Sequence, residues 1–370
     1  MDKKITEILD CLDADNPYAT YLNNNAISVV SGWIDTGSLL LNGIISGSLY
    51  GGIPRNRLTM LAGPSMCGKS YIIQKILANA QKQGLIPVIF DSENAIDAKG
   101  AAALGLDPSK VKYVPVFSLE QCRNEIYKFL TKAKEAGVSD KFIIAIDSLG
   151  NLESELQIGR MEKNSMSADM GSRAKAVKSL LRTCTSLAAL TKTTIIVSNH
   201  IYDDPSAMFP SLEKMMPGGK AAVYLPSVTV QLARKPMKED KETLGTLAVG
   251  QKSFPGVILR ALTVKNRFVK QYLEGEMYLS FEKGLNKYYG LADLAVGFNV
   301  LVQTGSTYNL PNGEKLGYYS KWKGNEELWQ KTILPGIEEA IKVAWSYGNK
   351  GGPDEGPDTD DPTEEETEDN

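Results

Sequence analysis

At positions 63–70 the chain reads Gly63-Pro64-Ser65-Met66-Cys67-Gly68-Lys69-Ser70, which matches the phosphate-binding pattern GxxxxGK(S/T). In this pattern the glycines let backbone N–H groups surround a phosphate, and the lysine reaches the β and γ oxygens. The hydroxyl of Ser70 is then a ligand for Mg²⁺. The motif follows the apolar run Leu58–Ala62 and precedes a helical pattern over Tyr71–Gln83. The stretch therefore predicts a site that binds ATP with Mg²⁺.

Short apolar runs alternate with longer amphipathic segments around this motif. Such alternation predicts parallel strands joined by crossover helices. Three later runs have less helix between them and predict a more antiparallel edge. The expected fold is α/β, with a mostly parallel central sheet flanked by helices. The first group of runs is Leu58–Ala62, Ile86–Phe90, Phe142–Ile146 and Thr194–Ser198, and the later group is Ser227–Leu232, Val257–Val264 and Met277–Phe281.

Polar residues follow the predicted strands at the edge where ligands gather in open α/β sheets. Asp147 ends the third run and is a candidate to hold Mg²⁺, although a helix cap would use the same residue. Glu93 lies just past the second run, where a carboxylate orients an attacking water or stands in a surface turn. His200 follows the fourth run, as a sensor of the γ-phosphate or as a buried, hydrogen-bonded histidine.

The overall composition narrows the class of protein. The apolar content of 42% and charged content of 23% are those of a globular chain. A single histidine excludes multi-histidine metal sites, and four widely spaced cysteines indicate reduced thiols. No apolar run has the length of a membrane span, and the N-terminus lacks a signal-peptide core, so a cytoplasmic protein without membrane contact is expected.

The net charge of −3 is the sum of a basic body and a short acidic tail. Residues 351–370 carry ten acidic and no basic residues, and the remaining chain has 41 basic residues against 34 acidic ones. A tail of this composition is expected to be disordered. It serves solubility alone, or it mimics nucleic acid and competes for a basic body.

Four further stretches, in order along the chain, resemble the RecA family of DNA recombinases over about residues 30–285. They are the stretch from Ile34-Asp35-Thr36-Gly37-Ser38-Leu39 through Gly51-Gly52-Ile53-Pro54-Arg55, the segment Val88–Asp97 around Glu93, Met216-Pro217-Gly218-Gly219-Lys220-Ala221, and Val264-Lys265-Asn266-Arg267. His200 stands where bacterial RecA proteins carry glutamine. In this respect the chain is similar to the UvsX branch of tailed bacteriophages.

The resemblance implies a RecA-like P-loop ATPase core and an ATP-dependent recombinase that exchanges DNA strands in a helical filament. Glu93 would be the general base, and Lys265 and Arg267 would act on a neighbouring subunit's ATP. Alternatively, Lys265 and Arg267 are simply charged residues on a solvent-exposed strand face. A site completed by the next subunit makes a head-to-tail assembly, which does not need to close. The implied partners are single-stranded DNA, homologous duplex, further copies of the chain, a single-strand-binding protein and a loader.

DNA contacts are expected in the two segments after the third and fourth strands, about 153–171 and 201–219. Both are long and lack periodicity, which suggests function or a flexible loop. Basic residues there would follow phosphates while Met and Phe side chains stack on or wedge between bases. The candidates in these segments are Arg160, Met170, Met208, Phe209, Gly218 and Gly219, and Arg173 and Lys175 follow on the next helix.

The chain departs from the family pattern at two places, and two alternative functions remain to be considered. Where many RecA proteins place a tyrosine against adenine, this chain reads Ala98-Lys99-Gly100-Ala101. Residues 286–350 give no clear match to the bacterial C-terminal domain, although 326–346 predict a helix. A recombination mediator that lacks strand exchange and a hexameric helicase motor use the same core.

The expected division of the chain has four parts. Residues 1–30 form an N-terminal helix and linker that contacts another subunit, and residues 31–285 form the ATPase core. Residues 286–350 form a C-terminal region, and residues 351–370 form the acidic tail. The expected roles are DNA recombination, repair and replication.

Overall fold

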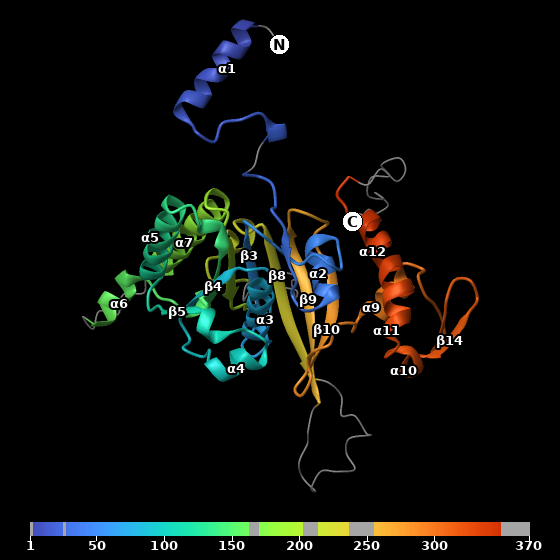
Figure 1. Ribbon diagram of the computed structural model, residues 1–370. Coiled ribbons are helices and arrows are strands. Elements are labelled where there is room, and N and C mark those ends of the chain that lie inside the picture. Colours follow the sequence, from blue (N-terminus) through green and yellow to red (C-terminus); the bar gives the residue numbers. More distant parts are fainter. Residues whose placement is uncertain (1–2, 25–26, 163–169, 203–213, 237–254, 349–370) are drawn as a thin grey trace, which may run out of the picture.

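The computed structural model describes residues 3–24, 27–162, 170–202, 214–236 and 255–348 (Figure 1). The candidate DNA contacts Met208 and Phe209 and the acidic tail lie outside these residues. Within the described chain, no helix combines the length and apolarity that crossing a bilayer requires.

A mixed sheet of nine strands lies at the centre of the described chain, in the order β11-β10-β9-β8-β3-β7-β6-β4-β5. The strands from β8 to β5 in this order run parallel, and β9, β10 and β11 extend the sheet with antiparallel pairing. The predicted α/β class and antiparallel edge are confirmed. The strands are β3 (Leu58–Ala62), β4 (Ile86–Asp91), β5 (Lys112–Pro115), β6 (Phe142–Asp147), β7 (Thr194–Asn199), β8 (Val228–Pro236), β9 (Gly256–Asn266), β10 (Glu274–Ser280) and β11 (Gly284–Leu285).

Helices cover both faces of this sheet, because alternate side chains of each central strand point to opposite faces. Leu61 and Ile143 belong to one buried cluster, together with α2 and α3. Their neighbours Met60 and Ile144 belong to a second cluster, with α5 and α7 (Figure 1). The helices are α2 (Leu39–Ser46), α3 (Lys69–Lys82), α4 (Ala98–Ala103), α5 (Leu119–Glu135), α6 (Glu155–Glu162), α7 (Met170–Leu190) and α8 (Lys220–Tyr224).

Residues 286–348 form helices and a three-stranded antiparallel sheet beside the core. The helix expected over 326–346 is interrupted by a π-helical turn at Trp329–Ile333. Pro335 follows in the first turn of the next helix and has no N–H to continue the regular pattern. The elements are α9 (Leu291–Gly297), β12 (Val302–Thr304), β13 (Thr307–Asn309), β14 (Lys315–Tyr318), α10 (Tyr319–Trp322), α11 (Glu326–Leu328) and α12 (Leu334–Ala344).

A buried carboxylate fastens this C-terminal part to the core. Glu338 on α12 accepts hydrogen bonds of 2.7 Å from the hydroxyl of Ser48 and of 2.7 Å from the backbone N–H of Leu49. Both donors lie in the turn after α2, and Lys342 neutralises the carboxylate at 2.9 Å. These contacts fix the C-terminal region against the turn after α2.

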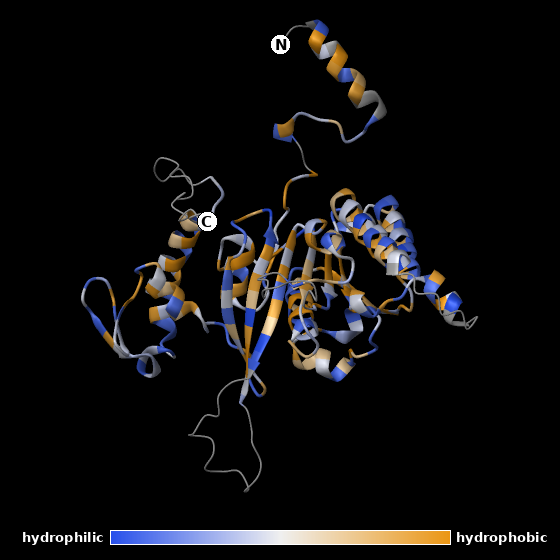
Figure 2. Ribbon diagram, turned by 180° about the vertical axis from the view of Figure 1, so that it is seen from behind, coloured by the Kyte–Doolittle hydropathy of each residue, from blue (hydrophilic) through white to orange (hydrophobic). Residues whose placement is uncertain are grey.

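The N-terminal helix α1 (Lys3–Asp15) extends away from the rest of the molecule (Figure 1). Its apolar side chains Ile5, Ile8, Leu9 and Leu12 are exposed to solvent, and Figure 2 shows apolar and polar residues interspersed along it. Exposed apolar side chains at these spacings form one face of a helix. That face has no packing partner among the described residues of its own chain.

Candidate functional site

The phosphate loop joins β3 to α3 at the predicted position. Gly68 caps α3 with a left-handed φ of 83°, and Lys69 begins the helix. The Lys69 side chain is buried, and its ammonium group donates to the carbonyls of Gly63 at 2.9 Å and Pro64 at 2.8 Å. The cation is therefore held inside a curved loop at a helix N-terminus, where backbone N–H groups and the helix dipole favour an anion.

The loop rests on the neighbouring strand β8. A Cβ atom added to Gly63 would lie 2.5 Å from the Cys67 sulfur and 2.7 Å from the Leu232 carbonyl oxygen, so only glycine fits. Cys67 is fully buried, and burial raises the pKa of its thiol. At the crest of the loop, Met66 is 81% exposed and has a φ of 62°.

Asp147 ends β6 beside the phosphate loop, because β6, β7 and β3 are adjacent in the sheet. It is 3% exposed, and burial raises its pKa, while hydrogen bonds from the hydroxyls of Ser198 and Ser70 oppose that rise. The sequence predicted Ser70 and Asp147 as the Mg²⁺ pair, and the structure brings them together. No three His, Cys, Asp or Glu side chains converge to form a metal site within the described ranges. Mg²⁺ at nucleotide sites uses few protein ligands, since phosphate and water supply the others.

Glu93 lies in the turn after β4, which Asp91 holds in place. The Asp91 carboxylate accepts from the backbone N–H groups of Glu93 at 2.8 Å and Asn94 at 2.9 Å. One oxygen of Glu93 accepts a 2.7 Å hydrogen bond from the Ser148 hydroxyl and lies 3.6 Å from Nε2 of His200. Burial and the nearby Lys69 lower the pKa of His200, although Glu93 and Asp147 counteract them. The imidazole is therefore neutral near pH 7.

Lys265 and Arg267 are distant from the phosphate loop of their own chain. The backbone N–H of Arg267 donates to Ser227, whose N–H donates to Leu58 at the start of β3. The five residues of β3 then span about 17 Å before the loop begins. The Lys265 ammonium donates to the Tyr224 carbonyl, and burial followed by the charge of Arg267 lowers the pKa of Lys265 to about 8. The pair therefore occupies the opposite end of the strands from the loop.

The first predicted DNA segment is partly helical. Arg160 lies on α6, Met170 begins α7, and Lys175 is exposed on α7. Arg173 makes internal contacts: its Nε donates to the Leu152 carbonyl at 3.1 Å, and its guanidinium lies 3.5 Å from Glu153. Of these two basic residues, Arg173 is therefore partly buried and held by contacts within the chain, and Lys175 is exposed on the surface.

The second predicted segment ends at Gly218 and Gly219, just before helix α8. Gly218 has a φ of 92°, and a Cβ atom there would lie 2.4 Å from Val177 on α7. Gly219 begins α8. Both segments follow strands at the sheet edge that carries the phosphate loop, and the Gly218–Val177 contact joins the end of one to the helix of the other.

Sequence reasoning missed three polar side chains at this site. Ser148 donates to Glu93, Ser198 donates to Asp147, and Arg234 donates from β8 to the Met66 carbonyl at 3.3 Å. A signal existed for the serines, because each is a polar residue at the end of an apolar run. Arg234 follows its run with no local pattern that points to the phosphate loop.

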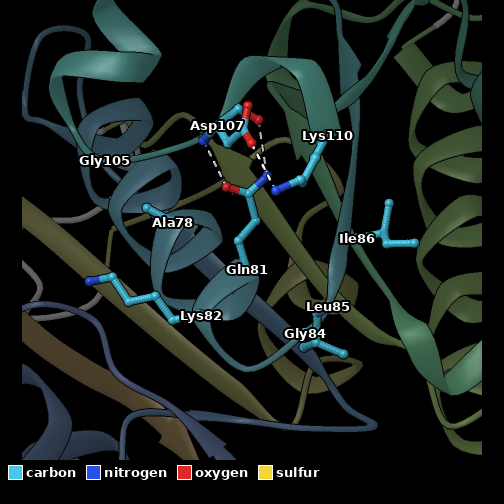
Figure 3. A pocket seen from close by; sticks show the side chains of 9 residues that line it. All are labelled: Ala78, Gln81, Lys82, Gly84, Leu85, Ile86, Gly105, Asp107 and Lys110. Carbon is cyan, nitrogen blue, oxygen red and sulfur yellow. Dashed lines mark hydrogen bonds and ion pairs between the residues drawn. The ribbon is translucent and has the colours of Figure 1, made fainter.

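A separate hollow of about 580 Å³ lies at the far end of α3 (Figure 3). Gln81 and Asp107 close one side through two hydrogen bonds of 2.8 and 3.1 Å, and Lys110 pairs with Asp107. Residues 81–86 join the end of α3 to the start of β4. The hollow therefore lies at the opposite end of the sheet from the phosphate loop and is not part of the candidate site.

A phosphate loop at the carboxyl edge of this sheet, with Asp147 at the end of β6 and Glu93 just after the neighbouring strand β4, defines a P-loop nucleotide-binding protein of the RecA-like class. The sequence model described as the RecA N-terminal domain matches residues 20–286. The chain therefore belongs to the RecA family.

Similar proteins support this assignment across most of their length. The chain is 29% identical to Protein RecA of Thermus aquaticus over 327 residues, which cover 86% of this chain and 88% of that protein. It is 29% identical to Protein RecA of Mycobacteroides abscessus over 315 residues, covering 85% and 84%. A stretch that takes 86% of the chain extends past residue 286. The aligned stretch therefore includes part of the C-terminal region, in which inspection of the sequence found no clear match.

Proposed function

We propose that this chain is an ATP-dependent recombinase that forms a helical filament on single-stranded DNA and exchanges strands with homologous duplex. The observation that carries the proposal is the position of Glu93. It lies beside Asp147 and the phosphate loop, at the edge from which both predicted DNA segments leave the sheet. DNA at those segments is then close enough to influence the hydrolytic groups.

In this proposal the residues of the site divide the work on ATP. Lys69 and the N–H groups of residues 63–70 bind the phosphates, and Ser70 with Asp147 holds Mg²⁺, which neutralises the charge that develops on them. Glu93 orients the attacking water and accepts its proton. His200 is close enough to Glu93 to report the state of the γ-phosphate to the segment that follows β7.

The filament supplies the cations that each site lacks. Lys265 and Arg267 lie too far from their own phosphate loop, and they serve the ATP of an adjacent subunit instead. The exposed apolar face of α1 is suited to bind a neighbouring copy. We assign residues 1–30 to this subunit contact, 31–285 to the ATPase core, 286–350 to the C-terminal region and 351–370 to an acidic tail.

The finer placement within the family rests on His200. It stands where bacterial RecA proteins carry glutamine, and we place the chain near the bacteriophage UvsX branch. Roles in replication and repair, a host-cytoplasmic location, a single-strand-binding partner and a loader accompany that placement.

The test measures ATP hydrolysis with and without single-stranded DNA over a range of salt concentrations. Turnover should require DNA and fall as salt rises, because phosphate contacts release counterions. Electron microscopy with a slowly hydrolysed ATP analogue should show open filaments. Equal turnover without DNA would favour a mediator, and closed rings would favour a helicase.

A further inference from the structure

The crest of the phosphate loop has an unusual backbone. Met66 is in the left-handed region with a φ of 62°, which non-glycine residues avoid because Cβ approaches the carbonyl oxygen. Its side chain is 81% exposed and gains little from packing. The shape of the loop at this point therefore needs support from outside the loop.

Strand β8 provides that support through one side chain. Arg234 donates from Nη1 to the Met66 carbonyl at 3.3 Å. Two residues earlier on the same face of β8, Leu232 is in contact range of Gly63 at the start of the loop. The strand thus carries both the base and the crest of the phosphate loop.

Holding this carbonyl also fixes a group that nucleotide binding uses. The Met66 carbonyl and the Cys67 N–H belong to one planar trans peptide and point in opposite directions. When the Arg234 guanidinium holds the carbonyl, the Cys67 N–H therefore points away from the guanidinium. A donor to phosphate inside the loop needs this orientation.

We propose that Arg234 is a positioning residue of the nucleotide site, which keeps the Met66–Cys67 peptide oriented for phosphate binding. This inference rests on the proposed function only in requiring that the loop bind ATP. It assigns Arg234 a role within its own subunit, distinct from the cations Lys265 and Arg267.

The experiment measures the affinity of the full chain for ATPγS with Mg²⁺ by calorimetry, without DNA. Arg234→Met should weaken binding about fivefold, the effect of losing one solvent-exposed hydrogen bond of ordinary strength. The matched control is Lys235→Met, which removes the adjacent cation, paired with Glu276 at 2.7 Å, and should leave affinity unchanged. Thermal unfolding shows whether each variant is folded.

A second variant separates positioning from direct phosphate contact. Met66→Gly removes the steric cost of the left-handed backbone, so in that background Arg234→Met should weaken binding less than about twofold. Met66→Ala keeps the cost and should leave the fivefold effect in place. An equal loss in all three backgrounds would mean that Arg234 touches the phosphates itself, and no loss in any would show that it has no role; either overturns the inference. Failure of the unaltered chain to bind ATPγS would instead refute the proposed function.

Discussion

Glu93 has two neighbours that act on its carboxylate in different ways. The Ser148 hydroxyl donates to it at 2.7 Å and so fixes the orientation of the carboxylate that we propose as the general base. His200, at 3.6 Å, is an uncharged neighbour near neutral pH and a cationic one in acid. The charge that faces the proposed base therefore depends on the protonation of the imidazole.

Exchange of Glu93 for glutamine should separate ATP binding from ATP hydrolysis. Glu93→Gln keeps the size and the hydrogen bond to Ser148 but removes the proton acceptor, so turnover should fall by about a hundredfold or more. ATP affinity should stay within about twofold of the unaltered chain. Single-turnover hydrolysis and equilibrium binding measure the two quantities, with Lys69→Ala as the variant that loses both. Unchanged turnover would remove Glu93 from the mechanism.

The pH dependence of turnover should identify His200. Because folding lowers its pKa from 6.5, the residue is neutral above pH 6.5 and becomes charged only in more acidic solution. A charged imidazole pairs with Glu93 and weakens the base, so turnover should fall below pH 6.5. The unfolded chain binds this proton more readily than the folded one, so the stability contribution of His200 is also lost as the pH falls.

The measurement is turnover at saturating ATP and DNA between pH 8 and pH 5, for the unaltered chain and His200→Gln. Glutamine has no proton to gain in this range, so the acid limb of the variant should be flatter. Identical limbs in the two proteins would assign the acid loss to another group.

At the residue scale, the sequence predicted those site residues that directly follow a strand. Asp147 and Ser70 were predicted as partners because the ends of parallel strands meet at one edge, and the structure brings them together. Arg234 escaped prediction because its contact with Met66 spans 168 positions in the sequence and depends on how β8 lies beside β3.

Strand β8 also connects the second DNA segment to the phosphate loop. The side-chain amide of Gln231 accepts from the Lys214 N–H at 3.0 Å and donates to the Lys214 carbonyl at 2.8 Å. In the sheet, Gln231 is paired with Ala62, the residue before Gly63. The end of this segment is thus fixed to the strand that lies next to β3, which leads into the phosphate loop.

Removal of this amide should weaken the response to DNA more than basal turnover. Gln231→Leu deletes two hydrogen bonds at about 1 kcal/mol each, so the DNA concentration for half-maximal stimulation should rise about thirtyfold. Thr229→Val is the matched control, because it deletes a buried hydrogen bond of 3.1 Å two residues earlier on the same strand. If both variants respond to DNA alike, Gln231 only stabilises the fold.

At the scale of elements, burial decided what could be predicted. The central strands are apolar on both faces, so β3 matched its predicted limits and β4, β6 and β7 extended one residue further. The edge strand β5 is mostly exposed and lacks an apolar run. The strands β12–β14 are short and largely polar, and they pair only with one another, so no local pattern marked them.

Mixing two inactive variants should test whether sites are shared between subunits. Lys265→Ala lacks the cation and Glu93→Gln lacks the base, so each alone should hydrolyse little ATP. In a mixed filament some junctions pair an intact Glu93 with an intact Lys265, and those junctions should be active. Turnover at equal ratio should reach about a quarter of the unaltered level if subunits mix at random. No rescue at any ratio would mean that Lys265 acts within its own subunit or not at all.

Charge balance over the whole chain gives a prediction for residues 351–370. Their ten acids are tethered to a body with a surplus of basic residues, at an effective concentration of about a millimolar. Truncation after Lys350 should tighten duplex binding at low salt, and the effect should shrink as salt screens the charges. Fluorescence anisotropy with labelled duplex measures this. Unchanged affinity would leave the tail a role in solubility alone.

The separation of the phosphate loop from Lys265 and Arg267 along the strands gives the proposed filament a direction. At one terminus the last subunit holds ATP that no neighbour's cations reach, so this nucleotide is hydrolysed slowly. At the other terminus the last subunit presents its cations to solvent, and its own ATP lies in a complete junction that turns over. Subunits should then depart mainly from the second terminus while the first keeps its triphosphate. The assembly would move along DNA by losing subunits at one end and adding them at the other.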